Sequence, residues 1–138
     1  MLRQLINPLL PLVPRFLVDR VAEPYVAGAG LKDALQSVQS NSAKGFSSTL
    51  AVLGEELLDE GQVREVVEEY RKTLVSLHEN ALPCGLSIKP THLGLRINRE
   101  IALKSFQSLA EAAEPGKTFI RLDMEDSTTT ADILWLYR

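Results

Sequence analysis

The sequence has few of the residues that build disulfide bonds, metal centres and nucleic-acid surfaces. Its single cysteine, Cys84, excludes an intrachain disulfide, which fits a reducing compartment. The two histidines, His78 and His92, stand far apart and lack the spacing of a metal site. The net charge is -3 and no basic stripe is present, so a nucleic-acid partner has little support.

A long apolar run is also missing. Residues 1–18 are rich in leucine and valine, but prolines interrupt them and charged residues follow closely. The run therefore stays short of the ~18 residues that a membrane helix needs. The triplet at 27–29 is similar to a signal cleavage site, yet the charged residues ahead of it argue against one. We interpret residues 1–14 as a proline-punctuated lead segment that packs on the domain, with contact to a membrane surface as the alternative.

What the sequence does have is a globular composition in a chain of domain size. It contains 138 residues, of which 45% are hydrophobic and 24% are charged. Short apolar stretches alternate with amphipathic ones, which predicts βαβ units and a parallel sheet with right-handed crossovers. We expect strands at 48–53, 86–89 and 118–122, and helices at about 15–27, 31–42, 59–80, 98–113 and 128–138.

Charged residues follow all three predicted strands. Glu55 comes after the first strand, Lys89 closes the second, and Asp123 follows the third within TFIRLDMED at 118–126. The carboxyl ends of parallel strands share one edge of a sheet, where α/β proteins place their chemistry. Charged residues also cap buried strands for structural reasons alone. Three of mixed sign on one edge favour a functional site.

Four stretches of the chain resemble the N-terminal part of the proline dehydrogenase (proline oxidase) catalytic domain. They are YVAGAGLKDAL at 25–35, STLAVLGEE at 48–56, LSIKPTHLGL at 86–95 and FIRLDMEDS at 119–127. The last two are the specific ones. The resemblance covers the chain after about residue 16 and implies an α/β fold of the (β/α)8 TIM-barrel type for residues 15–138. It also implies a flavin enzyme with FAD, which oxidises L-proline to Δ1-pyrroline-5-carboxylate in proline catabolism and passes the electrons to quinone.

The resemblance implies roles for four residues. Lys89 matches the family lysine whose ammonium pairs with the proline carboxylate, and a point cation at a strand end suits an anionic substrate. Asp123 matches the active-site aspartate between substrate and flavin, and Met124 matches the next position, whose backbone lies against the flavin. Glu55 matches a glutamate that in some members forms an ion pair closing over the substrate. Many members have aspartate where this chain has Ala51, which leaves the network around Glu55 open.

Other polar residues have structural interpretations. We expect Arg121, inside the third strand, to make a structural ion pair, and Asp126 or Ser127 to cap the last helix. The lone cysteine is predicted to be a packing residue, because no activating partner is evident. His92 lies in the loop after the second strand, where a surface position is favoured over a place at the mouth of the site.

A complete (β/α)8 barrel takes about 250 residues. We therefore expect this chain to be a fragment with the N-terminal helices and the first three β/α units. The alternative is a non-catalytic half-barrel remnant that acts only through self-association or a partner chain. We predict that the isolated chain neither retains flavin nor oxidises proline. The enzyme is expected in the cytoplasm, with peripheral contact at the inner face of the membrane as a further expectation from the quinone partner.

Overall fold

The computed structural model describes residues 14, 26–28, 30–54, 57 and 59–138. The chain divides into two units after residue 34, and the sheet lies in the second, residues 35–138. The lead segment predicted at 1–14 lies outside the described residues except for Pro14. The helix predicted at 15–27 lies outside them too, except for residues 26 and 27, which are not helical. No helix in the described part of the chain is long and apolar enough to cross a membrane.

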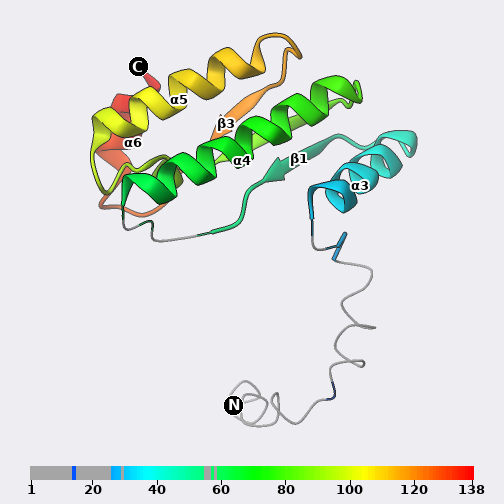
Figure 1. Ribbon diagram of the computed structural model, residues 1–138, viewed down its shortest axis with the longest axis horizontal. Coiled ribbons are helices and arrows are strands. Elements are labelled where there is room, and N and C mark those ends of the chain that lie inside the picture. The colour runs from blue at the N-terminus through cyan, green and yellow to red at the C-terminus, as the bar shows by residue number, and fades with distance from the viewer. Residues whose placement is uncertain (1–13, 15–25, 29, 55–56, 58) are drawn as a thin grey trace. The chain divides into compact units, whose positions relative to one another are not determined.

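The second unit is built around a parallel sheet with the strand order β1-β2-β3 (Figure 1). Strand β1 spans Ser48–Ala51, β2 spans Cys84–Ile88 and β3 spans Ile120–Leu122. Leu86 lies opposite Leu50 of β1 on one side and opposite Ile120 of β3 on the other. The predicted parallel sheet is confirmed.

The strand boundaries differ from the predicted ones because pairing with neighbours decides where a strand begins and ends. Strand β2 begins two residues earlier than predicted, since Cys84 pairs with Ser48. Gly85 belongs to the strand and not to the turn, and a Cβ there would lie 3.3 Å from the carbonyl oxygen of Phe119. Close approach of two backbones therefore explains this glycine.

The helices follow the strands in the predicted alternation. They are α3 at Leu31–Ala43, α4 at Glu60–Glu79, α5 at Arg99–Ala113 and α6 at Thr130–Tyr137. Each lies within two residues of its predicted bounds. Asn98 caps α5 as expected, because its side chain accepts a hydrogen bond from the Glu100 N–H at 2.8 Å. Asp59 caps α4 in the same way through the Gln62 N–H at 3.0 Å.

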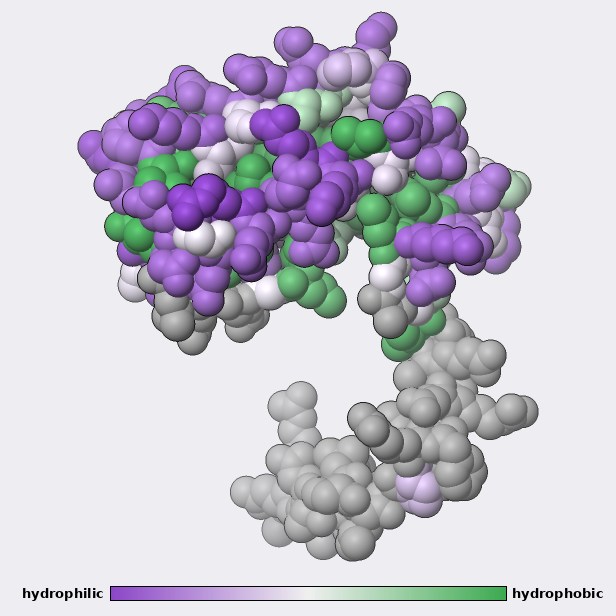
Figure 2. Space-filling model, in the orientation of Figure 1, coloured by the Kyte–Doolittle hydropathy of each residue, from purple (hydrophilic) through white to green (hydrophobic). Residues whose placement is uncertain are grey.

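Helices α4 and α5 lie side by side and cover one face of the sheet (Figure 1). Leu86 and Ile88 of β2 are fully buried against Tyr70 and Leu74 of α4 and Leu109 of α5. The solvent side of these helices is mainly hydrophilic in Figure 2. Each amphipathic helix therefore stabilises the sheet with one apolar stripe, at about 25 cal/mol per Å² of apolar surface buried.

A smaller cluster joins α3 to the start of β2. Val38 of α3, Leu77 of α4 and Cys84 of β2 form its buried centre. Burial raises the pKa of the Cys84 thiol, so the reactive thiolate is disfavoured. The predicted packing role of the cysteine is confirmed.

The opposite face of the sheet is left open by the described residues. Side chains alternate along a strand, so the neighbours of the buried Leu86 and Ile88 point the other way. On β1 this open face carries Thr49 and Ala51, which are both exposed. On β2 and β3 it carries polar side chains, and it leads to the carboxyl edge.

Candidate active site at the carboxyl edge of the sheet

Lys89 and Asp123 follow neighbouring parallel strands. Ile88 lies opposite Leu122, and the Asp123 N–H donates to the Ile88 carbonyl at 2.9 Å, which continues the ladder beyond the last strand residue. Neighbouring strands lie about 4.8 Å apart. The alternation of side chains puts both charged groups on the open face. The expectation that these two residues share one edge is confirmed.

Asp123 is held by two side chains of the same face. Its Oδ1 accepts a hydrogen bond from the Ser87 hydroxyl and another from the Arg121 Nε at 3.0 Å. Ser87 in turn accepts from Arg121 Nε at 3.2 Å and from Nη2 at 3.0 Å. The Asp123 side chain remains 29% exposed, whereas Ser87 is buried. The ion pair predicted for Arg121 is confirmed, with Asp123 as its partner.

Lys89 is half-buried, and within the described part of the chain its ammonium makes no hydrogen bond or ion pair. Its backbone directs the chain into the 3-10 helix η2, Pro90–Leu93. That helix ends at Gly94 with φ +90, and a Cβ there would lie 3.1 Å from Val63 and 3.2 Å from Ile101. The loop after Lys89 is thus pressed onto α4 and α5, which explains the Leu-Gly pair of the LSIKPTHLGL stretch.

Glu125 links the two loops that carry the charged pair. One of its carboxylate oxygens accepts the Thr91 N–H at 2.9 Å and the other accepts the Thr91 hydroxyl at 2.7 Å. Charge-assisted, two-point contacts of this kind fix geometry well. Sequence reasoning missed Ser87, Thr91 and Glu125. The position of Ser87 two residues before Lys89 was an available signal, since it puts both on one face.

A second link lies farther out on the surface. Asp126 forms an ion pair with Arg96, and its Oδ1 accepts the Thr128 N–H at 2.8 Å. These Thr128 hydrogen bonds and the nearby Arg96 charge hold the pKa of the Asp126 carboxyl below its usual value. Helix α6 has Thr129 as its N-cap, without a side-chain hydrogen bond. The predicted cap at Asp126 or Ser127 is therefore wrong, because the helix begins later, and Asp126 instead holds the turn before it.

Of the remaining two predicted site residues, Met124 is among the described residues and Glu55 is not. Met124 directly follows Asp123 and is 55% exposed, so its side chain is accessible beside the charged pair. Glu55 lies outside the described residues, and its predicted place at the edge stays a prediction. Strand β1 ends at Ala51, four residues before it.

His92 is fully buried, so its predicted surface position is wrong. It lies in η2, where Pro90 starts a tight turn that directs the ring inward. A Cβ on Gly54 would lie 3.1 Å from His92 Cε1 and Nε2, so the glycine leaves room for the ring. Both ring nitrogens lack hydrogen-bond partners among the described residues.

Tyr70 brings a second buried polar group close to the edge. Its hydroxyl has no hydrogen-bond partner within the described ranges. Burial raises the pKa of Tyr70 to about 12, against the lowering effect of the nearby Lys89 backbone and with a further upward contribution from Asp123. The phenol therefore stays neutral beside the charged pair.

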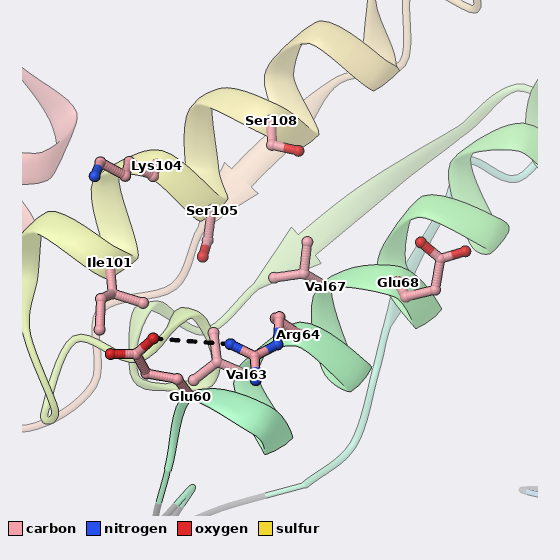
Figure 3. Close-up of a pocket in the computed structure, with 9 residues that line it drawn as sticks. All are labelled: Glu60, Val63, Arg64, Val67, Glu68, Ile101, Lys104, Ser105 and Ser108. Atoms are coloured by element: carbon pink, nitrogen blue, oxygen red, sulfur yellow. Dashed lines mark ion pairs between the residues drawn. The ribbon is translucent and has the colours of Figure 1, made fainter.

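A separate groove runs between α4 and α5 on their solvent side (Figure 3). It has a volume of about 420 Å³, with valine and isoleucine side chains at its floor and charged side chains from both helices at its rim. The lining residues are Glu60, Val63, Arg64, Val67, Glu68, Ile101, Lys104, Ser105 and Ser108. None of the residues at the carboxyl edge contributes to it. Nowhere in the described residues do three or more His, Cys, Asp or Glu side chains group to hold a metal ion.

No protein-family model matches the chain. Proline dehydrogenase 1 of Bacillus subtilis (strain 168) is 30% identical over 117 residues, which make up 85% of this chain and 39% of that protein. The proline dehydrogenase of Deinococcus radiodurans is 28% identical over 111 residues, 78% of this chain and 36% of that protein. The resemblance to the proline dehydrogenases is confirmed. The chain spans about two fifths of the length of the curated relatives it matches.

A solved structure shows the fold. It is the crystal structure of proline utilization A (PutA) from Bdellovibrio bacteriovorus inactivated by N-propargylglycine, with a TM-score of 0.73 and 16% identity. The match covers 81% of this chain and 14% of that one. Together with the parallel sheet, it confirms the predicted α/β fold.

Proposed function

We propose that the chain forms the first three β/α units of a (β/α)8 barrel that oxidises L-proline to Δ1-pyrroline-5-carboxylate. Two relatives named proline dehydrogenase match most of the chain, and the parallel strands with their helices fit the start of such a barrel. The open face of the sheet would then face the barrel interior. The whole protein, of which this chain is a part in this proposal, would carry the activity.

The observation that carries the proposal is the pair of opposite charges on adjacent strand ends. Lys89 has no partner in the described part of the chain, so it is available for the carboxylate of proline. Asp123 is anchored by Ser87 and Arg121, which fixes the direction of its second oxygen. In this proposal Asp123 orients the amine end of the substrate. The two contacts would fix both ends of a small amino acid, and such positioning lowers the entropic part of a reaction barrier.

The resemblance implies FAD, and the described residues fit one part of it. Met124 directly follows Asp123 at this edge, and in this proposal its backbone would lie against the flavin. Within the described ranges no glycine-rich loop follows a strand, so a phosphate cradle is not supplied here. When bound, FAD accepts a hydride from the carbon next to the ring nitrogen of proline. The electrons would then go to quinone, which gives the proposed cytoplasmic enzyme a reason for peripheral membrane contact.

A chimera tests the proposal. The matched part of Bacillus subtilis proline dehydrogenase 1 would be replaced by this chain, and flavin reduction by L-proline followed by absorbance. We expect reduction by L-proline, and its loss in the Asp123→Ala chimera with flavin still bound. A flavin-loaded chimera that proline does not reduce would contradict the proposal. The isolated chain is expected to bind no FAD.

The open face of the sheet favours a second candidate, in which the chain acts only through association. Phe119 is 70% exposed next to the exposed edge of β3, and the polar open face has no cover from the described residues. In that case the isolated chain forms a defined dimer, and Phe119→Ser shifts it to a monomer by light scattering. A monomeric wild-type chain would remove this candidate.

A further inference from the structure

Arg121 occupies a position that bridges two strands. Its Nε donates to both Asp123 and Ser87, and its Nη2 donates to Ser87 as well. The planar guanidinium makes such multiple contacts in one geometry, which an ammonium does not. Ser87, which is buried, adds its own hydroxyl to the same oxygen of Asp123. The Asp123 carboxylate is thus held by one side chain of its own strand, Arg121, and by one side chain of the neighbouring strand, Ser87.

Lys89 lies opposite Asp123, because the residues before them, Ile88 and Leu122, pair across β2 and β3. The two side chains are about one strand spacing apart, and opposite charges at such positions stabilise a sheet when they pair. They do not pair here: Asp123 forms its ion pair with Arg121, and the Lys89 ammonium has no partner in the described part of the chain. Among the described residues, the carboxylates at this edge are already engaged: Asp123 by Arg121 and Ser87, and Glu125 by Thr91.

We propose that Arg121 and Ser87 are positioning residues that hold the Asp123 carboxylate away from Lys89, so that the Lys89 ammonium stays available for the carboxylate of a substrate. The identity of that substrate as an amino acid such as proline rests on the proposed function. The geometry of the three protein groups does not. Arg121 therefore acts through Asp123 and makes no substrate contact itself.

Site-resolved amine modification of the full chain tests this without flavin or proline. The chain would be treated with a limiting amount of acetic anhydride, and the rate of Lys89 modification read by mass spectrometry relative to the exposed Lys104. In Arg121→Met, Asp123 loses its ion pair and keeps only the Ser87 hydrogen bond, so its carboxylate can turn toward Lys89. We expect Lys89 modification to slow about two- to fivefold, the effect of one partly exposed ion pair.

Three further measurements decide between pairing and general disruption. Arg121→Met combined with Asp123→Asn should return Lys89 modification to the wild-type rate, because the competing carboxylate is gone. Arg64→Met removes an arginine from another exposed ion pair, with Glu60 on α4, and should change nothing. The buried Cys84 reports unfolding, since its thiol reacts quickly with a thiol reagent only when the fold opens.

Two results would overturn the inference. One is an unchanged or faster Lys89 rate in Arg121→Met while Cys84 stays protected. The other needs no Arg121 variant, and so holds even if that variant does not fold. It is a more than twofold faster Lys89 rate in Asp123→Asn alone, which would mean that Lys89 and Asp123 pair in the wild type. Failure of proline oxidation in the chimera leaves both readouts intact, so the two proposals fail separately.

Discussion

The same short strands present two faces with opposite chemistry. On the face covered by α4 and α5, Leu86 and Ile88 are fully buried in the core. On the open face, one residue along, Ser87 and then Lys89 point toward the polar edge. A shift of register by one residue would exchange the two sets completely. Stability is thus concentrated on one face and the candidate chemistry on the other, so substitutions on the two faces should have separable effects.

The largest expected effect is on the covered face. Leu86→Ala should lower the free energy of unfolding by about 2–5 kcal/mol, because it leaves a cavity between β2 and both helices. Ser87→Ala, on the neighbouring residue, should cost about 1 kcal/mol through its lost hydrogen bonds. Urea denaturation of both variants checks this. Equal losses would mean that the two faces contribute alike to stability.

Tyr70→Phe should change the response to alkaline pH. Burial raises the pKa of Tyr70 to about 12, above the ~10 of an unfolded tyrosine. Its contribution to stability is therefore complete below pH 10 and is lost as the pH rises through 12. Across that pH window, the free energy of unfolding of the wild type should fall by up to about 2 kcal/mol more than that of Tyr70→Phe. Parallel denaturation series at pH 9 and above would measure this. Identical slopes for the two proteins would contradict it.

Glu125→Gln should loosen the link between the two loops of the open face. The amide carries no charge, so both Thr91 contacts lose their charge-assisted strength, at about 1 kcal/mol of unfolding free energy. Glu111→Gln, an exposed residue on α5, serves as the matched control and should be neutral. Faster hydrogen exchange of the Thr91 amide in Glu125→Gln, but not in Glu111→Gln, completes the test. No difference between the variants would remove the link from the description of the site.

The smallest expected effect concerns Asp126. Hydrogen bonds from Thr128 lower the pKa of its carboxyl below 3.8. The contribution to stability is therefore present above that value and is lost as the pH falls through the folded-state pKa. In Asp126→Asn, stability should therefore fall slightly less at acid pH than in the wild type. Circular dichroism, which follows the helicity of α6, would measure this. A steeper acid limb in the variant would show that the carboxyl is stabilised in its protonated form.

Sequence reasoning succeeded where local pattern decides the outcome. The alternation of strands and helices predicts the parallel sheet, and parallel strands bring Lys89 and Asp123 to one edge without any knowledge of tertiary contacts. The Asn98 cap follows from its position before an apolar periodic stretch. Each of these follows from local patterns, because the alternation of strands and helices alone sets the direction of neighbouring strands.

Sequence reasoning failed where distant residues decide the outcome. His92 is buried because Gly54, from another loop, leaves space for its ring. Strand β2 begins at Cys84 and not at the predicted residue 86, because Cys84 and Gly85 pair with Ser48 and Thr49 of β1. The Thr91–Glu125 link joins residues 34 positions apart, and single positions give no signal for such a contact. Burial and cross-strand contacts require the folded chain.

The Michaelis constant for proline tests the open face most directly. In the flavin-loaded chimera, Lys89→Ala removes the cation assigned to the substrate carboxylate. Lys104→Ala removes an exposed lysine on the solvent side of α5, away from the open face of the sheet. A lost charged hydrogen bond of about 1.5–3 kcal/mol corresponds to a rise in KM of roughly 10- to 150-fold. We predict that rise for Lys89→Ala and none for Lys104→Ala. An unchanged KM in Lys89→Ala would remove Lys89 from the site and contradict the assignment of the open face to substrate binding.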